Sequence, residues 1–228
     1  MRLLLTTPPI VFWSLVILSL PSCSTQHQNP ALQPSSPDSS VITQQTYYYN
    51  CPGSPDIPVS IKDDVAWIFL PGKTINLPHV RSGSGAKYSD GINTFWSKGE
   101  EAYFQTETGK IPNCRNNRRL AIWEHAKLTG VDFRAVGNEP GWMLELRPYY
   151  INYMGDYGET RQTFVRPEPE SDREERQTVF RVDNGSDRMT IILKGKECFD
   201  TMSGEKYETT VIIRQYGNRL QGCGKALH

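Results

Sequence analysis

The stretch SGSGAKYSDGINTFWSKGEEAYFQT, residues 82–106, decides the fold of the first half of the chain. It opens on Ser-Gly-Ser-Gly, which favours a loop, and continues into runs of β-forming residues such as Thr94-Phe95-Trp96. Asp90-Gly91 and Gly109 are turn signals that separate these runs. Short strands with closely spaced turns are typical of a small antiparallel barrel or sandwich.

The same pattern covers residues 46–115. Further strand-forming runs are TYYYNC at 46–51, VSIK at 59–62 and VAWIFL at 65–70. Pro52-Gly53 and Pro71-Gly72 punctuate them. We therefore expect an all-β domain over residues 46–115.

Residues 116–130 predict one short α-helix that joins this domain to a second one. An asparagine at 116 or 117 can cap its start, and Gly130 can end it. Residues 131–228 return to strand-like runs, for example 142–146 and 209–213. The expected architecture is all-β, with two small antiparallel β-barrel-like domains joined by one helix.

The N-terminus has the pattern of an export signal over residues 1–22. Arg2 precedes the apolar run IVFWSLVILSL at 10–20, which is too short to span a bilayer. The following Leu20-Pro21-Ser22-Cys23 resembles the lipobox of bacterial lipoproteins. That resemblance implies cleavage before Cys23, acylation of this cysteine, and, with serine at 24, sorting to the outer membrane, facing the periplasm.

Residues 23–45 predict a disordered tether behind that anchor. The segment is rich in Ser, Gln and Pro and has almost no bulky apolar residue to bury. Over the whole chain, 25 Lys and Arg balance 25 Asp and Glu, which argues against nucleic-acid binding.

Four cysteines remain once Cys23 is acylated, and an even set in an exported chain predicts disulfides. Three pairings are open. We expect the local one, Cys51–Cys114 and Cys198–Cys223, which staples each half of the chain separately. A four-cysteine zinc site is the alternative, but the sequence has no Cys-x-x-Cys pair, so we expect neither a metal nor a cofactor.

Tyr49-x-Cys51, SGSGAKYSDG, FWSKGEEA and a closing Cys114 resemble, in this order, the MliC family of membrane-bound inhibitors of C-type lysozyme. The resemblance covers about 70 residues and implies an eight-stranded antiparallel barrel. It also implies that the Ser-Gly loop enters the active-site cleft of the lysozyme.

Carried over by motif position, Ser84 would form a hydrogen bond in that cleft and Lys98 would meet the catalytic carboxylates. Gly83 and Gly85 would let the backbone approach closely. Ser82 and Tyr88 complete the expected lysozyme-binding set, although Tyr88 is better explained by packing. We expect Trp96 to alternate with Lys98 and to lie inside the barrel.

The second domain resembles a β domain of bacterial envelope lipoproteins to which no activity is attached. FRAVGNEPGW and the GCG ending carry this resemblance. Asn138 and Glu139, in a Gly/Pro turn, form a candidate binding site, with a purely structural turn as the alternative.

Three functional classes follow. The first is a membrane-anchored inhibitor of C-type lysozyme, with the lysozyme and the bilayer as partners. The second is an envelope lipoprotein that binds a small ligand or senses envelope stress through residues 131–228. The third, an enzyme, is disfavoured because no G-x-S-x-G or HExxH motif is present and no cysteine is left free for a Cys–His pair.

Overall fold

The computed structural model describes residues 44–228. The predicted export signal, Cys23 and nearly all of the predicted tether lie outside the described residues. Within residues 44–228, no helix has the length and apolar character to cross a bilayer.

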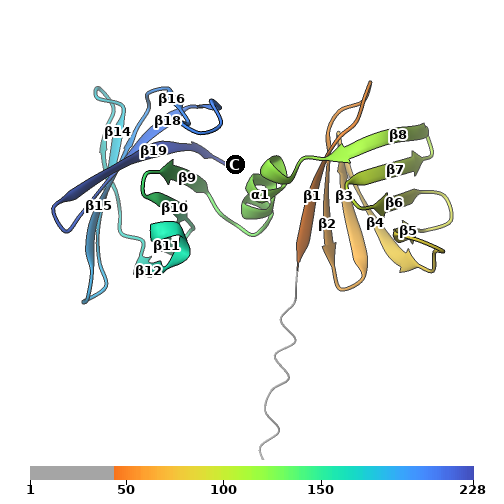
Figure 1. Ribbon diagram of the computed structural model, residues 1–228, viewed down its shortest axis with the longest axis horizontal. Coiled ribbons are helices and arrows are strands. Elements are labelled where there is room, and N and C mark those ends of the chain that lie inside the picture. Colours follow the sequence, from red (N-terminus) through yellow and green to blue (C-terminus); the bar gives the residue numbers. More distant parts are fainter. Residues whose placement is uncertain (1–43) are drawn as a thin grey trace, which may run out of the picture. The chain divides into compact units, whose positions relative to one another are not determined.

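The first eight strands form a closed antiparallel barrel (Figure 1). They are β1 (Gln45–Asn50), β2 (Ile57–Lys62), β3 (Val65–Leu70), β4 (Lys73–Val80), β5 (Ala86–Ser89), β6 (Thr94–Lys98), β7 (Glu101–Thr106) and β8 (Gly109–Asn116). Each strand pairs with the next, and β1 pairs with β8 to close the ring. The eight-stranded barrel implied by the resemblance is therefore present.

An aromatic core fills this barrel. Tyr49, Phe95 and Phe104 are fully buried and pack ring to ring, with centroids 4.9 to 5.7 Å apart. A disulfide joins Cys51, just after β1, to Cys114 on β8. The large aromatic rings and the covalent link together fix the inward face of β1, β6, β7 and β8.

One helix, α1 (Arg118–Leu128), follows β8 directly. The Asn117 side chain accepts a hydrogen bond from the Leu120 amide at 3.2 Å and caps its start, as the sequence predicts. The helix buries Ala121, Trp123 and Ala126, and Trp123 packs on Tyr207 of the second domain. The predicted helix is thus confirmed, within the expected range of 116–130.

The second domain is a curled nine-stranded sheet in the order β12-β11-β10-β9-β19-β18-β15-β14-β13 (Figure 1). Its strands are β9 (Phe133–Asn138), β10 (Gly141–Leu146), β11 (Tyr150–Gly155), β12 (Thr160–Val165), β13 (Glu170–Asp172), β14 (Gln177–Asp183), β15 (Arg188–Lys194), β18 (Thr209–Gln215) and β19 (Asn218–Ala226). A 3-10 turn, Asp156–Gly158, precedes β12. The all-β class is confirmed, and this second unit is a half-barrel because the edge strands β12 and β13 do not pair with each other.

A two-stranded hairpin, β16 (Cys198–Phe199) with β17 (Lys206–Tyr207), stands beside this sheet. The second disulfide, Cys198–Cys223, ties the hairpin to β19. Of the three pairings open in the sequence, the structure has the local one.

His125 on α1 is partly buried, and its Nδ1 lies 3.0 Å from the Thr46 hydroxyl on β1. Burial lowers the pKa of His125 below its ordinary value of 6.5; Glu145 opposes this effect, and Arg134 and Arg147 add to it. The folded state therefore favours the neutral imidazole.

We predict that the stability of the protein depends on His125 near neutral pH. The contribution is fully present above the unfolded pKa and is lost as the pH falls through the lower folded pKa. In urea titrations between about pH 5.5 and pH 7.5, the free energy of unfolding should fall more with acidification in the wild type than in His125→Gln. His79→Gln, at an exposed histidine, should behave as wild type; equal pH dependence in all three proteins would contradict the assignment.

Candidate functional site

The Ser-Gly loop, residues 81–85, joins β4 to β5 at one end of the barrel. Ser82 Oγ donates to the carbonyl of Gly85 at 2.9 Å and lies 3.2 Å from that of Ser84. Gly85 has φ +67°, a left-handed conformation that favours glycine. The Ser82 hydroxyl therefore ties the loop to itself through hydrogen bonds to the loop's own backbone.

Trp96 on β6 holds this loop from the outside of the barrel. Its indole Nε1 donates to the Ser84 carbonyl at 2.8 Å, and 41% of the residue is exposed. The prediction that Trp96 packs inside is wrong. Residues two apart on a strand share a face, so Trp96 lies on the same outer face as Lys98, while Phe95 fills the core.

Lys98 ends β6 beside the loop. A Cβ built on Gly85 would lie 3.2 Å from Lys98 Cβ, so the loop backbone rests against the base of this lysine. The neighbouring carboxylate of Glu100 accepts hydrogen bonds from Arg118 and Asn116. These bonds hold the pKa of Glu100 below its ordinary value. Among residues 44–228, no carboxylate forms an ion pair with Lys98.

A groove of about 480 Å³ borders this lysine on the outer face of β6, β7 and β8. Trp96 and Tyr103 are cross-strand neighbours on its wall, and Arg115 adds a second cation. The site thus combines a thin polar loop, an exposed ammonium and an aromatic wall. Such a surface can enter a narrow, anionic cleft and contact its rim.

Tyr88 and Gly85, both predicted contact residues, have structural roles in the barrel. Tyr88 is 5% exposed and stacks on Phe95 in the core, so the packing alternative is the one that the structure shows. Gly83 has no atom within 4 Å of an added Cβ, whereas a Cβ on Gly85 would lie 2.2 Å from the Ser97 carbonyl. The fold of this chain therefore requires glycine at 85 and not at 83.

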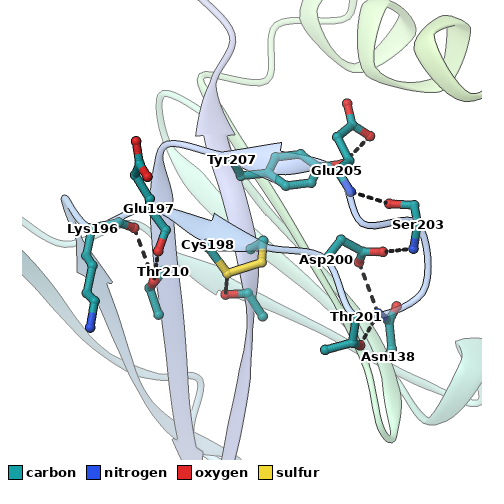
Figure 2. Close-up of a disulfide and its surroundings, with 12 residues drawn as sticks. Asn138, Lys196, Glu197, Cys198, Asp200, Thr201, Ser203, Glu205, Tyr207 and Thr210 are labelled. Carbon is teal, nitrogen blue, oxygen red and sulfur yellow. Dashed lines mark hydrogen bonds between the residues drawn. A yellow bond between two sulfur atoms is a disulfide. The ribbon is translucent and has the colours of Figure 1, made fainter.

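In the candidate site of the second domain, the Asn138 side chain braces a neighbouring hairpin (Figure 2). The Asn138 amide donates to Asp200 at 3.0 Å and to Thr201 at 2.8 Å. Burial would raise the pKa of Asp200, but hydrogen bonds from Ser203, Asn138 and Met202 hold it below its ordinary value. Asn138 thus anchors the β16–β17 hairpin, and Glu139 is exposed beside it.

The sequence prediction missed the function of Trp96 as a clamp on the loop. The signal was present, since Trp96 and Lys98 are two residues apart on one strand. Cys23, the predicted lipidation site, lies outside the described residues.

Residues 49–113 match the family model described as membrane-bound lysozyme-inhibitor of c-type lysozyme, MliC. We name the barrel that contains them the MliC domain after this match. The match begins on buried Tyr49 of β1 and ends beside Cys114, so it covers the barrel that carries the Ser-Gly loop and Lys98.

The MliC domain also resembles a curated protein of Yersinia enterocolitica serotype O:8 / biotype 1B (strain NCTC 13174 / 8081), the "Membrane-bound lysozyme inhibitor of C-type lysozyme". Identity is 42% over 73 residues, which is 31% of this chain and 62% of the relative. The chain thus spans less than two thirds of the length of that relative. No solved structure matches the chain.

Gly85→Ala should disturb the MliC domain where Gly83→Ala does not. The first substitution places a methyl group against the Ser97 carbonyl in a left-handed conformation, so it should lower the free energy of unfolding by at least about 1 kcal/mol. Gly83→Ala should stay within about 0.5 kcal/mol of wild type. Urea denaturation measures both, and equal losses would show that the loop is not held as described.

Trp96→Phe should loosen the Ser-Gly loop although an aromatic ring remains at position 96. It removes the indole donor to Ser84, which should cost about 0.5–1.5 kcal/mol and raise amide hydrogen exchange in residues 82–85. The matched control is Trp67→Phe, at a tryptophan that is 42% exposed on β3. Unchanged exchange in Trp96→Phe would mean that the indole does not hold the loop.

Proposed function

We propose that this protein is a membrane-anchored inhibitor of C-type lysozyme and not an enzyme. The observation that carries the proposal is the Ser-Gly loop fixed against Lys98 on an MliC domain. The proposed inhibitor inserts Ser84 and Lys98 into the active-site cleft of the lysozyme.

The chemistry of the target supports this arrangement. Retaining glycosidases hold two catalytic carboxyl groups about 5 Å apart. One ammonium group donates three hydrogen bonds and can therefore bridge both carboxylates. Because Lys98 has no ion pair within residues 44–228, it can bind them without giving up a partner of its own among those residues.

Loop rigidity supports the proposal as well. The contacts of Ser82 and Trp96 hold the Ser84 carbonyl before any partner arrives. A loop that is already ordered loses less conformational entropy on binding. Ser84 itself is exposed, and its hydroxyl is available to a partner.

The proposed location follows from the N-terminal sequence. We place acylated Cys23 in the outer membrane and the MliC domain in the periplasm, at the end of the predicted tether that precedes β1. Such a position would put the inhibitor between an incoming lysozyme and the cell wall.

We predict that Lys98→Ala weakens lysozyme binding by about 2–5 kcal/mol, the range for removing one partner of a buried charge pair. Ser84→Ala should cost less, about 1–3 kcal/mol, for one hydrogen bond in a desolvated cleft. Isothermal titration against a C-type lysozyme and residual lytic activity are the two measurements. Inhibition should also weaken at a pH low enough to protonate the carboxylates of the enzyme.

The matched control is Lys73→Ala. Lys73 is exposed and lies at the opposite end of β4 from the Ser-Gly loop. It should bind as wild type, and both lysine variants should unfold within about 0.5 kcal/mol of wild type. If Lys98→Ala binds as tightly as Lys73→Ala, the proposed insertion is wrong for this protein.

A further inference from the structure

A row of four side chains crosses the outer face of the nine-stranded sheet, far from the MliC motif in sequence. The strand register pairs Arg181 with Thr190, Thr190 with Arg214, and Arg214 with Arg219 on β14, β15, β18 and β19. Residues next to the first three members belong to the core, so the row itself faces solvent. Three arginines are thus aligned across four neighbouring strands.

The surface is hollowed at this row. A hollow of about 540 Å³ is lined by the row, by Arg188 and by Tyr216. The Tyr216 hydroxyl donates to Asp187, which ties the β18–β19 turn to the β14–β15 turn. The two turns therefore form one connected edge of the hollow.

The acidic groups around the hollow are already engaged. Glu170 accepts from Arg181 at 3.0 Å, Asp183 accepts from Arg188 at 2.6 Å, and Asp187 accepts from Tyr216. Within residues 44–228, no carboxylate forms an ion pair with Arg214 or Arg219.

Arg214 and Arg219 are directly opposite each other on adjacent strands. Adjacent strands are about 4.8 Å apart, and like charges in this position destabilise a sheet. Arg219 donates to the neutral Gln221 amide at 3.0 Å, which does not compensate its charge. The fold therefore keeps two arginines without an ion pair among residues 44–228 in cross-strand register at one hollow.

We propose that Arg214 and Arg219 form a binding site for a phosphate group, carried as free phosphate or as a phosphomonoester. Two guanidinium forks present more donors than the two oxygens of a carboxylate can accept, whereas a phosphate offers three or four oxygens and two negative charges. Arg181 and Arg188 line the same hollow, but each is paired with a carboxylate, so the free positive charge is that of Arg214 and Arg219. This site is separate from the proposed lysozyme contact and does not depend on it.

The test is titration of the full-length protein with inorganic phosphate and with glycerol 3-phosphate at constant ionic strength. Arg214→Gln/Arg219→Gln should lose affinity by about tenfold or more, as one lost charge-assisted contact already implies. The control is Arg161→Gln, at an exposed arginine on edge strand β12 of the same sheet, which should bind as wild type.

Unfolding without phosphate checks the fold. The double variant should be at least as stable as wild type, because it removes a repulsion. Binding of both probes would indicate a phosphomonoester ligand, and binding of inorganic phosphate alone would indicate the free anion. Absence of binding by the wild type, or equal loss in the Arg161 control, would overturn the proposal.

Discussion

The first barrel depends on a short seam between β1 and β8. Only Tyr49 with Asn116 and Asn50 with Arg115 are in register there, and among the neighbouring strands of this barrel only β4 and β5 have as short a pairing. The Cys51–Cys114 disulfide closes the same seam, and the loop-closure model assigns a link across 63 residues about 4 kcal/mol. Without this closure, β1 and β8 would be open edges, and the aromatic core would lose one wall.

Closure also positions the site. With the barrel closed, Phe95 is committed to the core and the alternate residues Trp96 and Lys98 to the outside. The indole of Trp96 then meets the Ser84 carbonyl, and Gly85 fits against Lys98 because it has no side chain. The proposed inhibitory surface is therefore a consequence of strand alternation in a closed barrel, and the proposed inhibition needs no large rearrangement of the loop.

The second domain is organised by its last strand. β19 lies between β9 and β18, so the end of the chain occupies the middle of the sheet (Figure 1). The same strand carries Cys223, which holds the β16–β17 hairpin, and Arg219, which completes the arginine row. This domain therefore has its own core, its own disulfide and its own candidate site, and its contribution to the protein need not be the same as that of the MliC domain.

The sequence by itself determined the all-β class, a helix capped by Asn116 or Asn117 and the MliC motif, because turn residues, caps and a contiguous motif are local signals. Even the shared face of Trp96 and Lys98 follows from their spacing. Only the tertiary structure decided that this face is the outer one, which of three cysteine pairings forms, that Tyr88 is buried, and that Asn138 is a brace. The arginine row was also decided by the tertiary structure. Arg181 and Arg219 are separated by 38 residues in the chain, and only the strand register places them in one row. These features depend on which strands become neighbours, and residue spacing along the chain does not encode that long-range choice.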